Sequence, residues 1–392
     1  MVPDLKEEIS LIQLCMLIII YEIGTAAVVG IGADAKQDVW ISIIISTLIG
    51  MGLMAMYHEM IKRFPGNNFY DLLQICFGKF VAKIIAQIYI VYFFYISARV
   101  IRDFAELLVT VVLPNTPIEF TTILFMFVVS YIMYLGFEVF SRTAETFTPY
   151  IFVFLMLITL FLLINQSINF NNLKPILYNG VTPIIKAVFP GIMTFPFGEL
   201  IVFTVVMNQV REIKIGKKYV IIAVFVSGLV IAYHGILNIT VLGVDTYTRT
   251  SFPLLMSARE ISIAQFVERI DPLVVFIVML GVFVKASIYF YCVLKGLEYT
   301  YQIPFRYYSF PVGLLVAPIS ILIANNYDEH IYEGIDIVPL YLHIPLQYVF
   351  PILVFVVLLI KSRKGGKSNV QNSKQKQEQK QKQSEEPATG NG

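Results

Sequence analysis

The sequence has few charged residues, few cysteines and few histidines for its length. Only 14% of its 392 residues are charged, whereas a soluble domain carries about 25%, so the chain cannot cover a water-facing surface. Its three cysteines, Cys15, Cys76 and Cys292, stand far apart and form no C-x-x-C pair, which argues against a zinc site or a redox dithiol. The four histidines are scattered. We therefore expect no enzyme, no metal and no cofactor.

Hydrophobic residues make up 57% of the chain, and the mean hydropathy is +0.74. Apolar runs of about 20 residues recur, long enough to cross a ~30 Å hydrocarbon core as helices. The alternating pattern of a membrane β-barrel is missing. We predict an all-α integral membrane protein with ten transmembrane helices. They are expected at residues 11–30, 39–61, 84–112, 119–140, 147–165, 183–206, 219–243, 272–294, 307–325 and 339–360.

Basic residues gather in alternate loops between these spans. They include Lys62, Arg63, Lys79, Lys83, Arg142, Arg211, Lys214, Lys217, Lys218, Lys295 and Arg306. By the positive-inside rule both termini are cytoplasmic, with the long outer loop 244–271 as an exception that weighs less in the rule. Residues 1–362 should form one transmembrane domain that begins without a cleaved signal peptide. Residues 363–392 should form a disordered, basic Gln/Lys-rich tail.

Two spans contain residues that interrupt a helix deep in the membrane. Span six has prolines and glycines at Pro190, Gly191, Pro196 and Gly198, and a proline removes one backbone hydrogen bond. Span one has small residues at Gly24, Thr25, Ala26 and Ala27, which either unwind the helix or only let it pack closely against a neighbour. Interrupted first and sixth spans are typical of an inverted-repeat transporter fold whose ligand lies near the bilayer midplane.

Three charged residues lie in the middle third of the predicted membrane: Glu22 in span one, Glu199 after the span-six break, and Lys285 in span eight. Charges there are costly, so they should face inward and be paired. Lys285 is either a structural partner of a carboxylate or a substitute for a metal cation, with Glu22 as its counter-charge. Glu199 should have a structural or gating role, accepting free N–H groups of the second half-helix.

Span three carries two predicted ion pairs at i,i+4 spacing. They are Arg102 with Glu106 and Arg99 with Asp103. A structural ladder toward the outer end of a long helix is the favoured interpretation.

Through a series of motifs along the chain, the sequence resembles the B subunits of bacterial spore germinant receptors, a branch of the amino acid–polyamine–organocation transporter superfamily. The resemblance extends from about residue 9 to 362. The residues that carry it are Ile23–Gly32, Asp38–Trp40, Arg102–Glu106, Thr116–Ile118, Asn171–Leu177, Phe195–Glu199, Glu268–Asp271 and Val284–Tyr289.

The resemblance implies a LeuT-like five-plus-five inverted repeat, with repeats at about 9–165 and 183–360, and a pocket lined by spans one, three, six and eight. We assign Gly24, Thr25, Ala26, Tyr92, Phe195, Pro196 and Gly198 to that pocket. The family assembles with an A subunit and a lipoprotein C subunit in the inner spore membrane. The expected function is nutrient sensing that triggers germination, and the alternative is a proton- or ion-coupled amino acid transporter. A third candidate, a structural scaffold, leaves the break and the charges unexplained.

Overall fold

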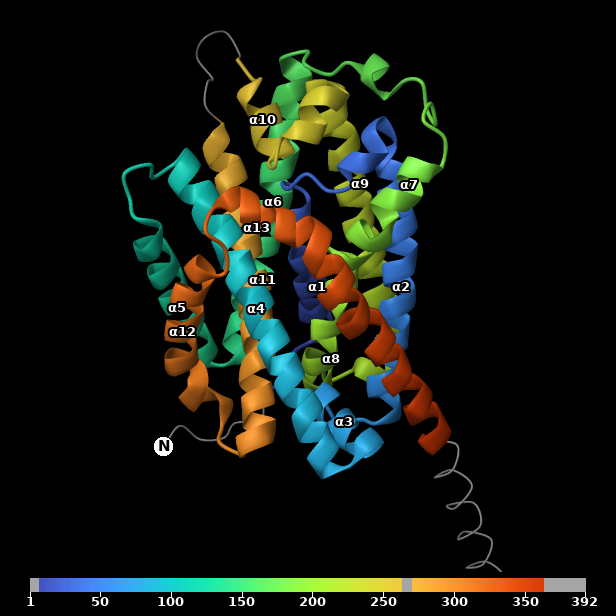
Figure 1. Ribbon diagram of the computed structural model, residues 1–392, viewed down its shortest axis with the longest axis vertical. Helices are drawn as coiled ribbons and strands as arrows, with labels where there is room; N and C mark the ends of the chain where they lie inside the picture. Colours follow the sequence, from blue (N-terminus) through green and yellow to red (C-terminus); the bar gives the residue numbers. More distant parts are fainter. Residues whose placement is uncertain (1–6, 263–269, 363–392) are drawn as a thin grey trace, which may run out of the picture.

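The computed structural model describes residues 7–262 and 270–362, and in these residues the chain is helical apart from loops and one isolated bridge (Figure 1). Part of the Glu268–Asp271 motif and the tail 363–392 lie outside the described residues. The α-helices are α1 Leu11–Ala26, α2 Val39–Arg63, α3 Phe69–Phe77, α4 Lys79–Val111, α5 Ile118–Leu135, α6 Phe137–Ile164, α7 Thr182–Lys186, α8 Phe203–Val206, α9 Lys217–Arg249, α10 Pro253–Arg259, α11 Asp271–Tyr301, α12 Ser309–Leu322 and α13 Tyr327–Tyr332.

Short 3-10 and π-helical segments join or extend these helices. They include η1 Ala33–Asp38, η3 Ala187–Ile192, η4 Phe197–Val202, η8 Glu333–Ile337 and η9 Pro339–Val349. Within the described residues, nine helical stretches are long and apolar enough to cross a membrane. They correspond to predicted spans two to ten, and the last of them runs from η9 to Ser362. The all-helical membrane class predicted from the sequence is therefore confirmed.

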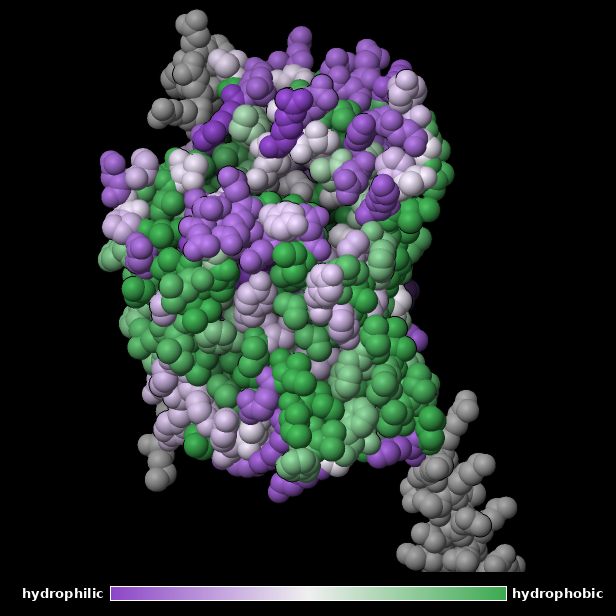
Figure 2. All heavy atoms as spheres, viewed as in Figure 1, coloured by the Kyte–Doolittle hydropathy of each residue, from purple (hydrophilic) through white to green (hydrophobic). Residues whose placement is uncertain are grey.

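Hydrophobic side chains cover the middle of the molecule, and hydrophilic ones gather at its two ends (Figure 2). Large apolar residues on α4, α5 and α6 are exposed, for example Val91, Phe127 and Met156. Such a surface suits lipid and not water, because large exposed apolar patches are rare on soluble proteins.

The helix of span one is shorter than predicted. It ends at Ala26, and the chain then runs without a regular helix to η1. Gly24, Thr25 and Ala26 keep the helical conformation, so of the two alternatives for this segment, unwinding is not found at these three residues. Small residues remain good enough helix formers when tertiary packing favours them, and here the packing of α1 on α11 does so. The interruption begins one residue later, at Ala27.

The helix of span six is interrupted. After α7, the backbone leaves the helical region at Phe189, before Pro190. A turn at Phe195 and Pro196 then separates residue 194 from η4. Prolines explain these positions, because each lacks the N–H that a continuous helix would use. Phe189 is exposed, whereas Pro196 in the turn is buried, and there neighbouring protein groups can replace the lost bonds.

Helix α11 is the most buried of the nine stretches, because 78% of its most apolar 18 residues lie inside the protein. It packs against α4, α1 and α6, and α1 lies in the centre of the bundle in Figure 1. Lys285, in the middle of α11, is fully buried and lies in the core of the molecule.

Candidate functional site

Lys285 joins three elements in this core. Its ammonium forms an ion pair with the Glu199 carboxylate of η4 and donates a hydrogen bond to the Thr25 hydroxyl of α1 at 3.3 Å. Lys285 is 0% exposed and Glu199 is 2% exposed. The ion pair thus connects span eight with the segment that follows the span-six break, and the hydrogen bond connects it with the end of α1.

Aromatic rings surround the same ammonium. Its Nζ lies 4.2 Å from the ring centroid of Phe195 and 5.2 Å from that of Tyr21. Both distances fall in the range of a cation–π interaction. The Tyr21 hydroxyl also donates to the backbone carbonyl of Glu199 at 3.4 Å. Phe195 belongs to the turn itself, so the break in span six positions one of the rings that face Lys285.

Glu22 is not the partner of Lys285, contrary to the prediction. It is 0% exposed, and among the residues that the structure describes neither of its carboxyl oxygens has a hydrogen-bond partner. Lys285 pairs with Glu199 instead, because η4, directly after the break, places Glu199 in the core. The prediction that the Glu199 side chain caps the second half-helix is also wrong: η4 has no side-chain cap.

Gly24 and Gly281 meet where α1 crosses α11. A Cβ atom on either glycine would overlap the Cα atom of the other. Of the two alternatives left open for span one, close helix packing is the one found at Gly24. Ala26, at the end of α1, is buried as well.

A buried polar cluster lies between α4 and η9, and the sequence analysis identified only its Tyr92, not His343 or Gln347. The Tyr92 hydroxyl lies 2.7 Å from Nδ1 of His343, and the Gln347 amide donates to Tyr92 Oη at 2.8 Å. Gln347 Oε1 has no hydrogen-bond partner in the described part of the chain, and a Cβ on Gly198 would strike this atom. This set, Tyr92, His343 and Gln347, links span ten to the segment after Pro196. The only available signal was the i,i+4 spacing of His343 and Gln347 in an apolar run.

At the C-terminal end of α4, one predicted ion pair is found and the other is not. Arg102 lies 3.5 Å from Glu106. Arg99 and Asp103 do not pair with each other. Arg99 lies 3.5 Å from Glu333 and also donates to the carbonyl of His330, whereas Asp103 lies 2.9 Å from His330 Nε2.

The reason for this difference is tertiary. The loop region 323–338, which includes α13 and η8, packs on the end of α4. It provides Glu333 to Arg99 and His330 to Asp103, contacts that sequence spacing alone does not reveal. Burial raises the pKa of Tyr327 in this loop, and its ring stacks on His330 with centroids 5.8 Å apart.

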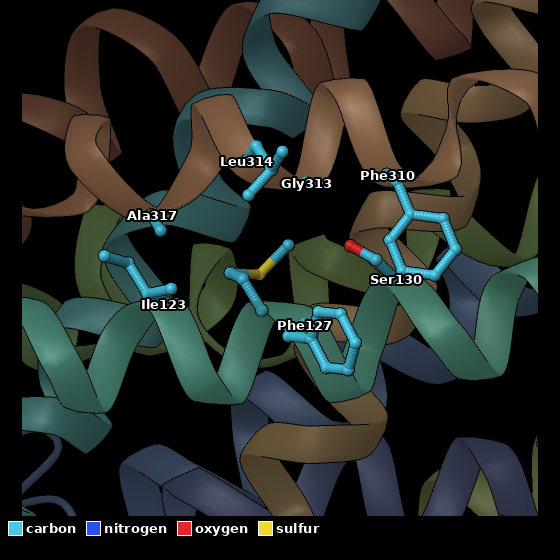
Figure 3. A pocket seen from close by; sticks show the side chains of 8 residues that line it. Ile123, Phe127, Ser130, Phe310, Gly313, Leu314 and Ala317 are labelled. Carbon is cyan, nitrogen blue, oxygen red and sulfur yellow. The ribbon is translucent and has the colours of Figure 1, made fainter.

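A shallow apolar pocket lies between α5 and α12 (Figure 3). Ile123, Phe127 and Leu314 line it and are exposed, so it opens to the outside of the bundle and not to the core. Its residues include none of those predicted for ligand binding. We do not assign the ligand to this pocket.

Comparison with known proteins agrees with this architecture. A family model described as "Spore germination protein" matches residues 8–329. Spore germination protein KB of Bacillus subtilis (strain 168) is 34% identical over 372 residues, covering 94% of this chain and 100% of the relative.

Two solved structures share the fold at low sequence identity. One is MhsT in complex with L-phenylalanine, with a TM-score of 0.64, 11% identity and coverage of 90% of this chain and 99% of that chain. The other is Mhp1, a nucleobase-cation-symport-1 family transporter with bromovinylhydantoin bound, with a TM-score of 0.60, 15% identity and 91% of each chain. The resemblance inferred from the motifs is confirmed, and the chain belongs to the spore germination protein family.

Proposed function

We propose that this protein is the B subunit of a spore germinant receptor, which senses a small nutrient in its core and triggers germination. The observation that carries the proposal is a full-length relative among spore germination proteins together with a charged cluster at an interrupted span. Midplane charges beside irregular backbone are costly in a membrane, and their usual reason is a functional site.

The architecture proposed here is ten spans in two inverted repeats of five. Helix α1 adds a tenth, shorter apolar helix to the nine long stretches. The similarity in fold to MhsT and Mhp1 over about nine-tenths of the chain supports a transporter-like arrangement. The repeats would cover about residues 9–165 and 183–360.

The ligand pocket is proposed between the end of α1 and the turn in span six. Thr25, Ala26, Phe195, Pro196 and Gly198 lie at or beside this junction, and Tyr92 closes it from α4. Backbone N–H groups near the turn would bind a ligand carboxylate, and Phe195 would cover its apolar part. Because these side chains are buried or half-buried, we infer a closed form of the pocket, which opens to admit a ligand.

Lys285 is proposed to act as a built-in cation. It holds the segment after the break against α1 through Glu199 and Thr25, a link for which other proteins use a metal ion. An ammonium carries one positive charge and three donors, so the closed form needs no sodium.

Both termini are proposed to be cytoplasmic, in the inner membrane of the spore, where A-type and C-type subunits would be partners. Two contacts support the placement of both termini on the same side of the membrane. Ile9 bridges to Val210, and Arg63 donates to Ser362 at 3.3 Å. The basic loops after spans two and six are those that the positive-inside rule assigns to the cytoplasm.

The alternative is a proton- or ion-coupled amino acid transporter, for which the similarity to MhsT gives support at the level of the fold alone. Deleting the gene in the spore former and scoring germination against separate amino acids, sugars and nucleosides tests the receptor. Loss of the response to one nutrient supports it. Normal germination on every nutrient, with amino acid uptake by the purified protein in liposomes, would instead establish the transporter.

A further inference from the structure

Within the described residues, the cluster around Lys285 contains two carboxyl groups, Glu22 and Glu199, and one cation. Glu22 and Thr25 are three residues apart on α1 and so share a face of the helix. Lys285 contacts that face at Thr25, and both Lys285 and Glu199 are close enough to act electrostatically on Glu22. One ammonium neutralises one carboxylate, and the ammonium of Lys285 is already paired with Glu199. Glu22 is the excess group.

An ionised, unpaired carboxylate is not stable in such surroundings. Glu22 is 0% exposed, and in residues 7–262 and 270–362 no hydrogen-bond partner reaches either oxygen. Burying an isolated ionised carboxylate is so unfavourable that the group usually becomes neutral instead.

We propose that Glu22 is a proton-binding site, which holds one proton while the core is closed and releases it to water when the core opens. The bond that breaks is the O–H bond of the carboxylic acid. The closed form is then neutral at this cluster, with Lys285 and Glu199 as the charged pair and Glu22 as the acid. Opening of the pocket is thereby linked to the release of a proton, and acid favours the closed form by mass action.

The other groups near Glu22 do not supply the missing positive charge. Two groups that interact electrostatically with Glu22 are the phenols of Tyr21, on the same helix, and Tyr348, on η9. Neither phenol carries a positive charge. On the two other helices that pack against α1, Glu145 of α6 accepts a hydrogen bond from Gln13 at 2.9 Å and His234 of α9 bonds to the carbonyl of Val230 at 2.9 Å.

The direct test is infrared difference spectroscopy of the purified full chain at neutral pH, which detects protonated carboxyl groups. Glu22→Gln should remove one carboxyl band. Glu199→Gln should remove the same band, because Lys285 then pairs with Glu22 and the proton leaves. Lys285→Met should instead add a band, because two carboxyl groups then share the core with no cation. A spectrum that Glu22→Gln leaves unchanged overturns the proposal, as does a band that disappears when sodium replaces choline.

Stability provides a second, independent measurement. Glutamine copies a protonated glutamate in shape and charge, so Glu22→Gln should keep the unfolding temperature of the unmutated protein at neutral pH. A large loss of stability in Glu22→Gln would mean that the carboxylate is charged, and would contradict the proposal. Neither measurement depends on germination, so a failure here is separate from a failure of the proposed receptor function.

Discussion

Gly24 of α1 and Gly281 of α11 pack backbone against backbone, and this contact brings Thr25 within reach of Lys285. The two helices approach so closely only because neither residue has a Cβ. The close approach is therefore a condition for the polar link, and the two features should respond to mutation together.

Gly281→Ala should destabilise the protein, because its methyl group would overlap the backbone of Gly24. Overpacking a well-packed core costs about 1–3 kcal/mol, and Gly24→Leu should cost more. Thermal unfolding of the purified protein measures the effect. Gly52→Ala is the matched control, since Gly52 lies in α2 with no atom within 4 Å of an added Cβ among the described residues. Equal unfolding temperatures for both alanine variants would disprove the close contact.

Lys285→Met should abolish the germination response and lower stability, because it leaves Glu199 without its cation. Breaking a buried pair costs about 3–5 kcal/mol. Lys285→Arg should fail too, since the planar guanidinium does not fit a site built for a compact ammonium. Germination measured with sodium replaced by choline should be normal in unmutated spores. Strict dependence on sodium would refute the built-in cation.

Glu199→Gln should be milder than Glu199→Ala. Glutamine keeps the shape and can still accept a hydrogen bond from Lys285, whereas alanine leaves a cavity beside the ammonium. Dose–response curves for germination, at matched protein levels in the spore membrane, rank the two variants. If both behave like the unmutated protein, Glu199 has no role in closure.

The loop 323–338 should loosen when its contact with α4 is removed. Asp103→Asn weakens the interaction with His330, which lies 2.9 Å away, so amide hydrogen exchange in residues 327–337 should become faster. The control is Asp328→Asn. Asp328 is exposed and lies in α13, the short helix that also contains His330, and its substitution should leave the exchange rates unchanged. Identical exchange in the two variants would show that this contact does not hold the loop.

Local patterns were sufficient for much of the fold. The apolar runs predicted spans two to ten because length and hydropathy are properties of each segment alone. The interruption of span six was also predictable, because a proline acts on its own helix. In α1, by contrast, the small residues at Gly24 and Thr25 have two possible uses, and only the position of Gly281 selects between them.

The pairing of charges could not be predicted in the same way. Glu22 and Glu199 were both predicted near the depth of Lys285, and it is the placement of η4 after Pro196 that brings Glu199 to the ammonium. Arg99 and Asp103 have ideal spacing for a local pair, yet a loop more than 200 residues away in the sequence provides the partners of both. Such choices depend on contacts between distant segments.

The central claim is that a nutrient is sensed at the junction of α1 and the span-six turn. Its most direct test is the germination dose–response of deletion spores complemented with Thr25→Val, which keeps the shape but removes the hydroxyl that accepts from Lys285. The control is Thr159→Val, whose hydroxyl bonds only within its own helix, at 3.0 Å from the Leu155 carbonyl. Thr25→Val should shift the response at least tenfold, about 1.4 kcal/mol, while the control stays unchanged. The same curve for Thr25→Val and the unmutated protein, at equal protein levels, would contradict the account.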